Sequence, residues 1–147
     1  MSENKEQPDP LVDLSGWISE NEAQIQSHVK DGTAANTVGQ IGKVVDAAKT
    51  VFDAAVRIEN YDSLLGTSLS FVRIAGLKIL VLIHLGRQKE SKDLLKDMEN
   101  AFKKVKYELE RHRYYIPAKL ATRYGANPKK LIENYGEWIN YLKKHGK

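Results

Sequence analysis

The side chains best suited to chemistry in this sequence are basic and aromatic ones that alternate along one stretch. From Lys103 to Gly125 the chain reads KKVKYELERHRYYIPAKLATRYG, in which lysines, arginines and a histidine alternate with tyrosines. Lysine and arginine neutralise phosphates, and exposed tyrosines stack on nucleic-acid bases. Tyrosines at a helix end also commonly cover a core while their hydroxyl groups stay in water. The stretch therefore indicates polyanion binding, and the role of each tyrosine stays open.

The charge of the whole chain follows the same division. Residues 86–147 contain 16 basic and 8 acidic side chains, whereas residues 1–30 contain 2 basic and 6 acidic ones. A concentrated basic half is typical of a protein with a polyanionic partner. A lysine-rich helical surface in water would give the same composition, so both interpretations stay open. The candidate phosphate contacts of this half are Lys103, Lys106, Arg111, Arg113 and Arg123.

Catalytic signatures are absent from the sequence. The four histidines lie far apart, and none pairs with a second histidine or a carboxylate at a metal-binding spacing. There is no glycine-rich phosphate loop and no nucleophile elbow. The chain has no cysteine, which excludes disulfides and thiolate metal sites, and its polar, acidic start is unlike a secretory signal. We expect a cytoplasmic protein that is not an enzyme and needs no metal or cofactor.

Helices must position these side chains, because helical periodicity covers most of the chain and no strand signal interrupts it. We expect an all-α fold, a single-domain bundle of about five helices at residues 11–147, after a disordered polar tail at residues 1–10. Asn36 or Thr37 is the expected N-cap of the second helix, and Asn127 that of the last. The apolar spacing predicts helices at 11–29, 38–57, 63–85, 90–114 and from 128 onwards.

The helix predicted at 63–85 is apolar on nearly every side, which places it at the centre of the bundle. It contains two charged residues, Arg73 and Lys78, and an unpaired charge in a core is costly. Both either extend along the surface to water, pair with acids such as Asp46 or Asp53, or form a functional basic face. The charge-free part of this helix is too short to cross a bilayer of about 30 Å, so no membrane contact is expected.

Two glycines lie in the first turns of the helix predicted at 38–57. In a helix, Gly39 and Gly42 each cost about 0.8–1 kcal/mol relative to alanine. They lie beside Gln40 and Lys43, which are three residues apart and share one side of the helix. The missing side chains would let another backbone, of protein or nucleic acid, approach these two polar groups closely. A close contact between two helices of this chain is the alternative.

Three segments resemble one known family, the small all-helical subunit of type III (Csm-type) CRISPR–Cas effector complexes. TVGQIGKVV at 37–45 is similar to that family's Thr-x-x-Gln-Ile-basic-Lys helix start. SFVRIAGLKILVLIHLGRQ at 70–88 is similar to its apolar helix ending in Gly-Arg, and ENYGEWINYLKKHGK at 133–147 to its closing aromatic helix. Gly42 departs from the pattern, because the family often has a basic residue there.

The resemblance implies a non-catalytic role inside a ribonucleoprotein. Copies of the subunit would stack beside the guide RNA and its target RNA and would contact other effector subunits. Basic side chains would hold phosphates, while base pairing supplies sequence specificity and cleavage belongs to other subunits. The RNA-binding residues that the resemblance implies are Gln40 and Lys43 from the first motif, Arg87 from the second and, less closely matched, Arg73 and Lys78.

Two other functions stay open. A different helical nucleic-acid-binding protein could use residues 36–45 as the start of a DNA-recognition helix. A helical protein-interaction module could place its basic half against an acidic partner. Binding to RNA rather than duplex DNA would separate the first two interpretations, and binding to neither would favour the third.

Overall fold

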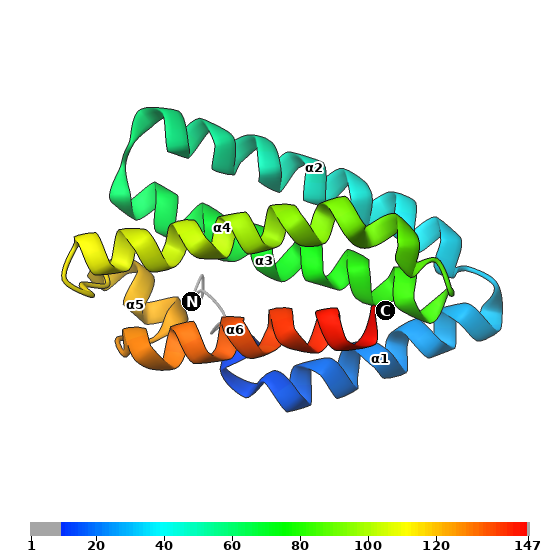
Figure 1. The fold of residues 1–147 in the computed structure, drawn as a ribbon. Coiled ribbons are helices and arrows are strands. Elements are labelled where there is room, and N and C mark those ends of the chain that lie inside the picture. Colours follow the sequence, from blue (N-terminus) through cyan, green and yellow to red (C-terminus); the bar gives the residue numbers. More distant parts are fainter. Residues whose placement is uncertain (1–9, 147) are drawn as a thin grey trace, which may run out of the picture.

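Residues 10–146, which the computed structural model describes, fold into six α-helices joined by short turns, with no strand (Figure 1). The expected all-α fold is confirmed, but with six helices rather than about five. The tail predicted to be disordered lies outside the described residues except for Pro10, which begins a short 3₁₀ helix. The α-helices are α1 (Leu14–Asp31), α2 (Ala34–Ile58), α3 (Tyr61–His84), α4 (Lys92–Arg111), α5 (Ala118–Tyr124) and α6 (Pro128–His145).

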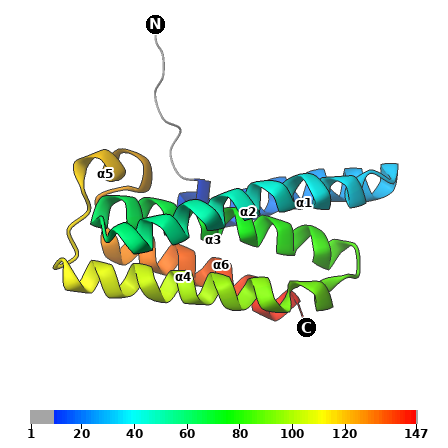
Figure 2. The same ribbon diagram turned by 90° about the horizontal axis from the view of Figure 1, so that it is seen from above.

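The central helix is α3, as the apolar sequence predicts. Leu69, Phe71, Val72 and Leu80 are among its fully covered side chains. Its most extensive contacts are with α2 and α4, and Figure 2 shows α1 and α2 on one side of α3 and α4 and α6 on the other. By length and composition α3 could also cross a membrane, with a mean hydropathy of 1.7. In this fold those apolar residues form the core of the bundle.

Two helix boundaries show how packing and capping combine. The N-cap predicted at Asn36 or Thr37 is wrong, because α2 begins at Ala34 after Thr33, whose side chain makes no capping hydrogen bond. Ala34 is buried, so packing extends the helix beyond its sequence signal. The cap of α6 is confirmed: the backbone N–H of Lys130 donates to the Asn127 side chain at 3.2 Å.

The short helix α5 is not predicted by the sequence. Its seven residues, which directly follow Pro117, are too few to display an apolar period. Leu120 of α5 packs against α3 where Gly66 leaves room, since a Cβ at Gly66 would stand 3.3 Å from Cδ2 of Leu120. Tyr124 is buried as well. These contacts hold α5 across one end of α3.

Helix α2 has more apolar residues around its circumference than the core buries. Val45 and Phe52 are buried, but the neighbouring Val44 and Val51, which have the same apolar spacing in the sequence, are 53% and 54% exposed. Ile58 is exposed too. These exposed residues are seven apart, so they align along one face of the helix. The apolar stripe of α2 consists of Val44, Ala47, Val51, Ala54 and Ile58.

Candidate nucleic-acid interface

The chain is rich in basic residues at one end of the bundle, where α4 ends, α5 lies and α6 begins. This end is on the left of Figure 1. Residues 103–130 contain 9 basic and 2 acidic side chains. The turn between α2 and α3 brings Glu59 and Asp62 to this end, which reduces its positive charge without cancelling it. We call the following residues the basic end: Lys106, Arg111, Arg113, Lys119, Arg123, Lys129 and Lys130.

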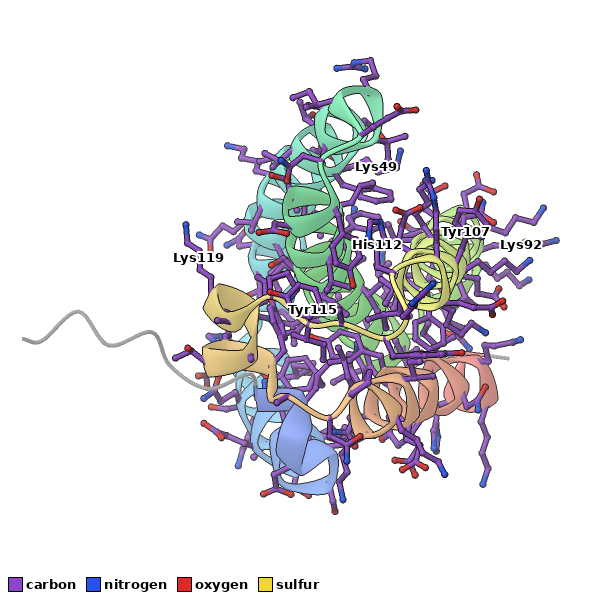
Figure 3. All side chains as sticks on the ribbon, turned by 90° about the vertical axis from the view of Figure 1, so that its left-hand side faces the viewer. Lys49, Lys92, Tyr107, His112, Tyr115 and Lys119 are labelled. Atoms are coloured by element: carbon purple, nitrogen blue, oxygen red, sulfur yellow. The ribbon has the colours of Figure 1, made fainter. Side chains whose placement is uncertain are left out.

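Three tyrosines lie exposed among these cations. Tyr107, Tyr114 and Tyr115 are 59%, 49% and 60% exposed, whereas Tyr124 is buried. Figure 3 looks onto this end and shows Tyr107 on α4 and Tyr115 on the segment that leads to α5. The two interpretations of the tyrosines, stacking on bases and covering the core, therefore apply to different residues. Tyr124 belongs to the core, and the other three have ring surface available for stacking.

The turn after α4 positions two of these tyrosines. Arg113 and Tyr114 have φ angles of 56° and 60°, a left-handed conformation that residues other than glycine rarely adopt. The Tyr61 hydroxyl donates a hydrogen bond to the Tyr115 carbonyl oxygen at 2.5 Å. The Tyr61 ring also stacks on His112, with ring centroids 3.8 Å apart. Burial, followed by the nearby negative charge of Glu108, raises the pKa of Tyr61 to about 12.

A buried carboxylate lies beneath the same turn. Glu108 is 3% exposed, and its oxygens lie 3.6 Å from Lys104 Nζ, 3.8 Å from Arg111 Nη1 and 3.7 Å from His112 Nε2. Within the part of the chain that the structure describes, Oε2 has no hydrogen-bond partner. Because the Glu108 carboxylate lies near Lys104 and Arg111, part of the positive charge of these two residues is compensated inside the protein.

The residues that the resemblance implies do not lie at the basic end. Gln40 and Lys43 are exposed in the first turns of α2, and Arg87 follows α3, both at the opposite end of the bundle. Arg87 is already engaged: its Nε and Nη2 donate to the two carboxylate oxygens of Glu90 at 2.6 Å and 2.8 Å. These hydrogen bonds raise the pKa of Arg87 and lower that of Glu90.

The side chain of Lys78 packs against Gly42. Lys78 is half-buried on the side of α3 that faces α2, and a Cβ at Gly42 would stand 3.4 Å from its Nζ. Gly42 is buried under this side chain. Its missing side chain therefore makes room for a close contact between two helices of this chain. Gly39 is different, because a Cβ there would meet nothing within 4 Å. Only Gly39 therefore leaves open space beside Gln40.

The remaining candidates lie apart from both groups. Arg73 is half-buried on α3 and has an interaction partner. Lys103 is exposed and lines a groove between α4 and α6 together with Glu99, Glu133 and Glu137, and Lys106 of the basic end lines the same groove. Asp53, considered as a partner for the charges of α3, instead pairs with Lys49 at 3.1 Å. The structure thus divides the ten candidates between two ends and the middle of the bundle.

A second group of titratable side chains joins α1, α3 and α6. His84 Nε2 lies 3.1 Å from Glu22 Oε2, and the Tyr141 hydroxyl donates to the same oxygen at 3.0 Å. Burial and this hydrogen bond raise the pKa of Tyr141 to about 12. Among residues 10–146, no three His, Asp or Glu side chains are grouped as a metal ion requires.

Three lysines of the basic end, Lys119, Lys129 and Lys130, are not among the site residues predicted from the sequence. All three belong to the basic half, so composition included them, but nothing in their spacing distinguishes them from other surface lysines. They come together only because α5 folds back across α3 and α6 starts beside it. A search of known proteins found no matching family, no similar curated protein and no similar solved structure.

Proposed function

We propose that this chain binds single-stranded RNA through its basic end and performs no catalysis of its own. The observation that supports this best is the set of three exposed tyrosines among exposed lysines and arginines. Cations that track a phosphate backbone, combined with aromatic rings that stack on bases, are the usual means of binding single strands without sequence preference.

The resemblance to the CRISPR subunit family suggests the assembly in which this chain would bind RNA. We infer a small subunit of a type III CRISPR effector complex in the cytoplasm. Its partners would be guide RNA, target RNA, other effector subunits and further copies of itself. Gln40, Lys43 and Arg87 would then form a second, weaker contact. The 24-residue helix α3 separates the two ends by about 36 Å, so one strand reaches both only when extended.

Salt dependence of binding tests the proposal. The double variant Lys106→Ala, Lys129→Ala removes two exposed cations at helical positions of the basic end. The slope of log K against log salt is negative, and each lost phosphate contact reduces its magnitude by about 0.7 for a single strand. The magnitude of the slope should therefore decrease by about 1.4. Fluorescence anisotropy with labelled oligonucleotides of two unrelated sequences would measure it, and both sequences should be affected alike.

The matched control is Lys92→Ala, Lys96→Ala, which removes the same charge from the far end of α4. Its slope should stay close to that of the unmodified protein. Equal slopes for the two double variants would mean that RNA responds only to net charge, and would contradict binding at the basic end. A preference for duplex DNA would favour a DNA-binding regulator instead.

A second candidate function, a protein-interaction module, is supported by the apolar stripe of α2. Its larger residues recur every seven positions, and Ala47 and Ala54 between them leave room for close approach of another helix. The partner we propose is a second copy of this chain, since the resembling family stacks its copies. Sedimentation equilibrium should show concentration-dependent association that Val44→Glu abolishes, and a monomer at all concentrations would contradict this function.

A further inference from the structure

A pocket of about 360 Å³ lies at the basic end between α2, α3 and α5. Ala48 and Val51 of α2 and Leu120 of α5 form its apolar part, and Lys119 and Arg123 of α5 contribute two cations. Lys119 lies on the outer edge of α5 in Figure 3. We call this the α5 pocket. Its volume is at the lower end of the range of small-ligand sites.

The charges of the α5 pocket are not compensated. None of the described residues that line it is acidic. Neither Lys119 nor Arg123 forms an ion pair with a carboxylate within residues 10–146, and the Arg123 guanidinium carbon lies 5.6 Å from the centroid of the Tyr124 ring. Arg123 Nε is shielded from water and lacks an acceptor in the same range. A buried donor without an acceptor is costly, so the Arg123 guanidinium is not fully satisfied by the described residues.

The wall opposite α5 is small and hydroxylated. Ser63, Thr67 and Ser70 line it from α3, with Gly66 between them. Ser70 Oγ lies 3.3 Å from the Tyr124 hydroxyl, so these two groups already form a polar pair at the pocket. Thr67 Oγ1 donates back to the Ser63 carbonyl oxygen at 2.6 Å, which leaves its lone pairs to accept from a ligand. Hydroxyl groups that both donate and accept match the sugar of a nucleotide.

We propose that the α5 pocket holds one nucleotide of a single-stranded RNA. Lys119 and Arg123 bind its phosphate, the hydroxyl groups of α3 face its ribose, and Val51 and Leu120 contact its base. This inference rests on the proposed RNA binding and assigns part of it to one site. It also gives the exposed Val51 a role that the apolar core does not require.

The test uses adenosine 5′-monophosphate as the probe and the full chain labelled with ¹⁵N. Binding should shift the amide resonances of residues 63–70 and 118–124. Val51→Glu places a carboxylate beside the two cations, and Lys119→Ala removes one of them. Each should weaken nucleotide binding about tenfold or more, because Lys119→Ala removes a charge-assisted contact with the phosphate and the carboxylate introduced by Val51→Glu repels it.

Each variant has a matched control. Val44→Glu makes the same change on the same stripe at equal exposure, but outside the pocket, and Lys96→Ala removes the same charge from an exposed position of α4 outside the basic end. Both controls should bind the nucleotide within twofold of the unmodified protein. Since both glutamate variants disrupt any pairing through α2, their difference reports the pocket alone. Pocket variants that behave like their controls would overturn the inference.

RNA binding by the same proteins separates the two proposals. If RNA binds and the pocket variants weaken it no more than their controls, the pocket assignment is wrong and the proposed function stands. If RNA does not bind, the proposed function is wrong. Nucleotide binding that Val51→Glu abolishes would then redefine the pocket as a site for free nucleotides, and its absence would overturn the inference as well.

Discussion

The indole ring of Trp138 occupies the space that a side chain at Gly76 would need. Trp138 is fully buried on α6, and its Nε1–H donates to the Val72 carbonyl oxygen at 3.4 Å, so the ring lies directly against the backbone of α3. A Cβ at residue 76 would collide with three atoms of the ring. The glycine therefore determines how closely α3 and α6 can pack.

Gly76→Ala should destabilise the protein. Overpacking a well-filled core costs about 1–3 kcal/mol, which exceeds the helix-propensity gain from alanine. Urea unfolding followed by circular dichroism would measure the change. Gly39→Ala is the control, because a Cβ there meets nothing within 4 Å, and it should stabilise the protein by up to about 1 kcal/mol. Two stabilised variants would mean that Trp138 does not contact α3 as described.

Leu80→Ala should lower the free energy of unfolding by about 2–5 kcal/mol, because it leaves a cavity in the middle of the core. Leu80 is 1% exposed on α3. Thermal unfolding would show the loss. Val44→Ala removes apolar carbon from an exposed position instead and should change the stability by less than about 0.5 kcal/mol. Similar effects at the two sites would be incompatible with a central α3.

Glu90→Gln should strengthen RNA binding if Arg87 takes part in it. The substitution breaks the paired hydrogen bonds that occupy the Arg87 guanidinium. Arg87 could then contact a phosphate, and the negative slope of log K against log salt should become steeper by up to about 0.7. Salt titrations with a single-stranded oligonucleotide provide the measurement.

Glu137→Gln, at an exposed position of α6, removes the same charge and serves as the control for that experiment. An identical gain in both variants would show that only net charge matters and that Arg87 is structural. Conversely, Arg87→Ala alone should affect RNA binding less than Lys43→Ala, because Glu90 already compensates the charge of Arg87.

Stability should fall as pH rises from 10 to 12, in part because of Tyr61. Its pKa is raised from 10.0 to about 12 in the folded protein. In that interval the unfolded chain has lost the phenolic proton and the folded chain still holds it, so raising the pH favours unfolding. Tyr61→Phe should therefore flatten the pH dependence of the urea midpoint in this interval.

Below pH 10 the same variant loses the hydrogen bond to Tyr115, which should cost about 0.5–1.5 kcal/mol. Tyr107→Phe, which alters an exposed hydroxyl, should leave the stability nearly unchanged. If the pH profile of Tyr61→Phe matches that of the unmodified protein, the Tyr61 hydroxyl is not held in the turn after α4.

Local sequence determined most of the helices of this protein. The apolar residues of α4 and α6 recur at the helical period, and both helices turn that face to the core as predicted, because one stripe on each helix is apolar and the rest is polar. Asn127 and Pro128 specify the start of α6 by interactions within one turn. The exclusion of strands and the central place of α3 follow from the same short-range pattern.

Helix α2 shows where this reasoning fails. Val44 and Val45 are equally apolar, yet Val45 is buried and Val44 is exposed. A helix with apolar residues over so wide an arc can turn either part of it inward, and the choice depends on where α3 lies. The buried position of Gly42 is likewise decided by Lys78, which approaches from another helix.

The sequence by itself determined that this protein is helical, has a basic C-terminal half and contains alternating cations and tyrosines. Only the tertiary structure decided which of them share a surface. Tyr124 enters the core while Tyr107, Tyr114 and Tyr115 stay in water, and Lys119 and Arg123 meet hydroxyl groups about 50 residues earlier in the chain. Helical periodicity reports only interactions within a few residues, whereas a binding surface depends on distances across space that the packing of helices sets.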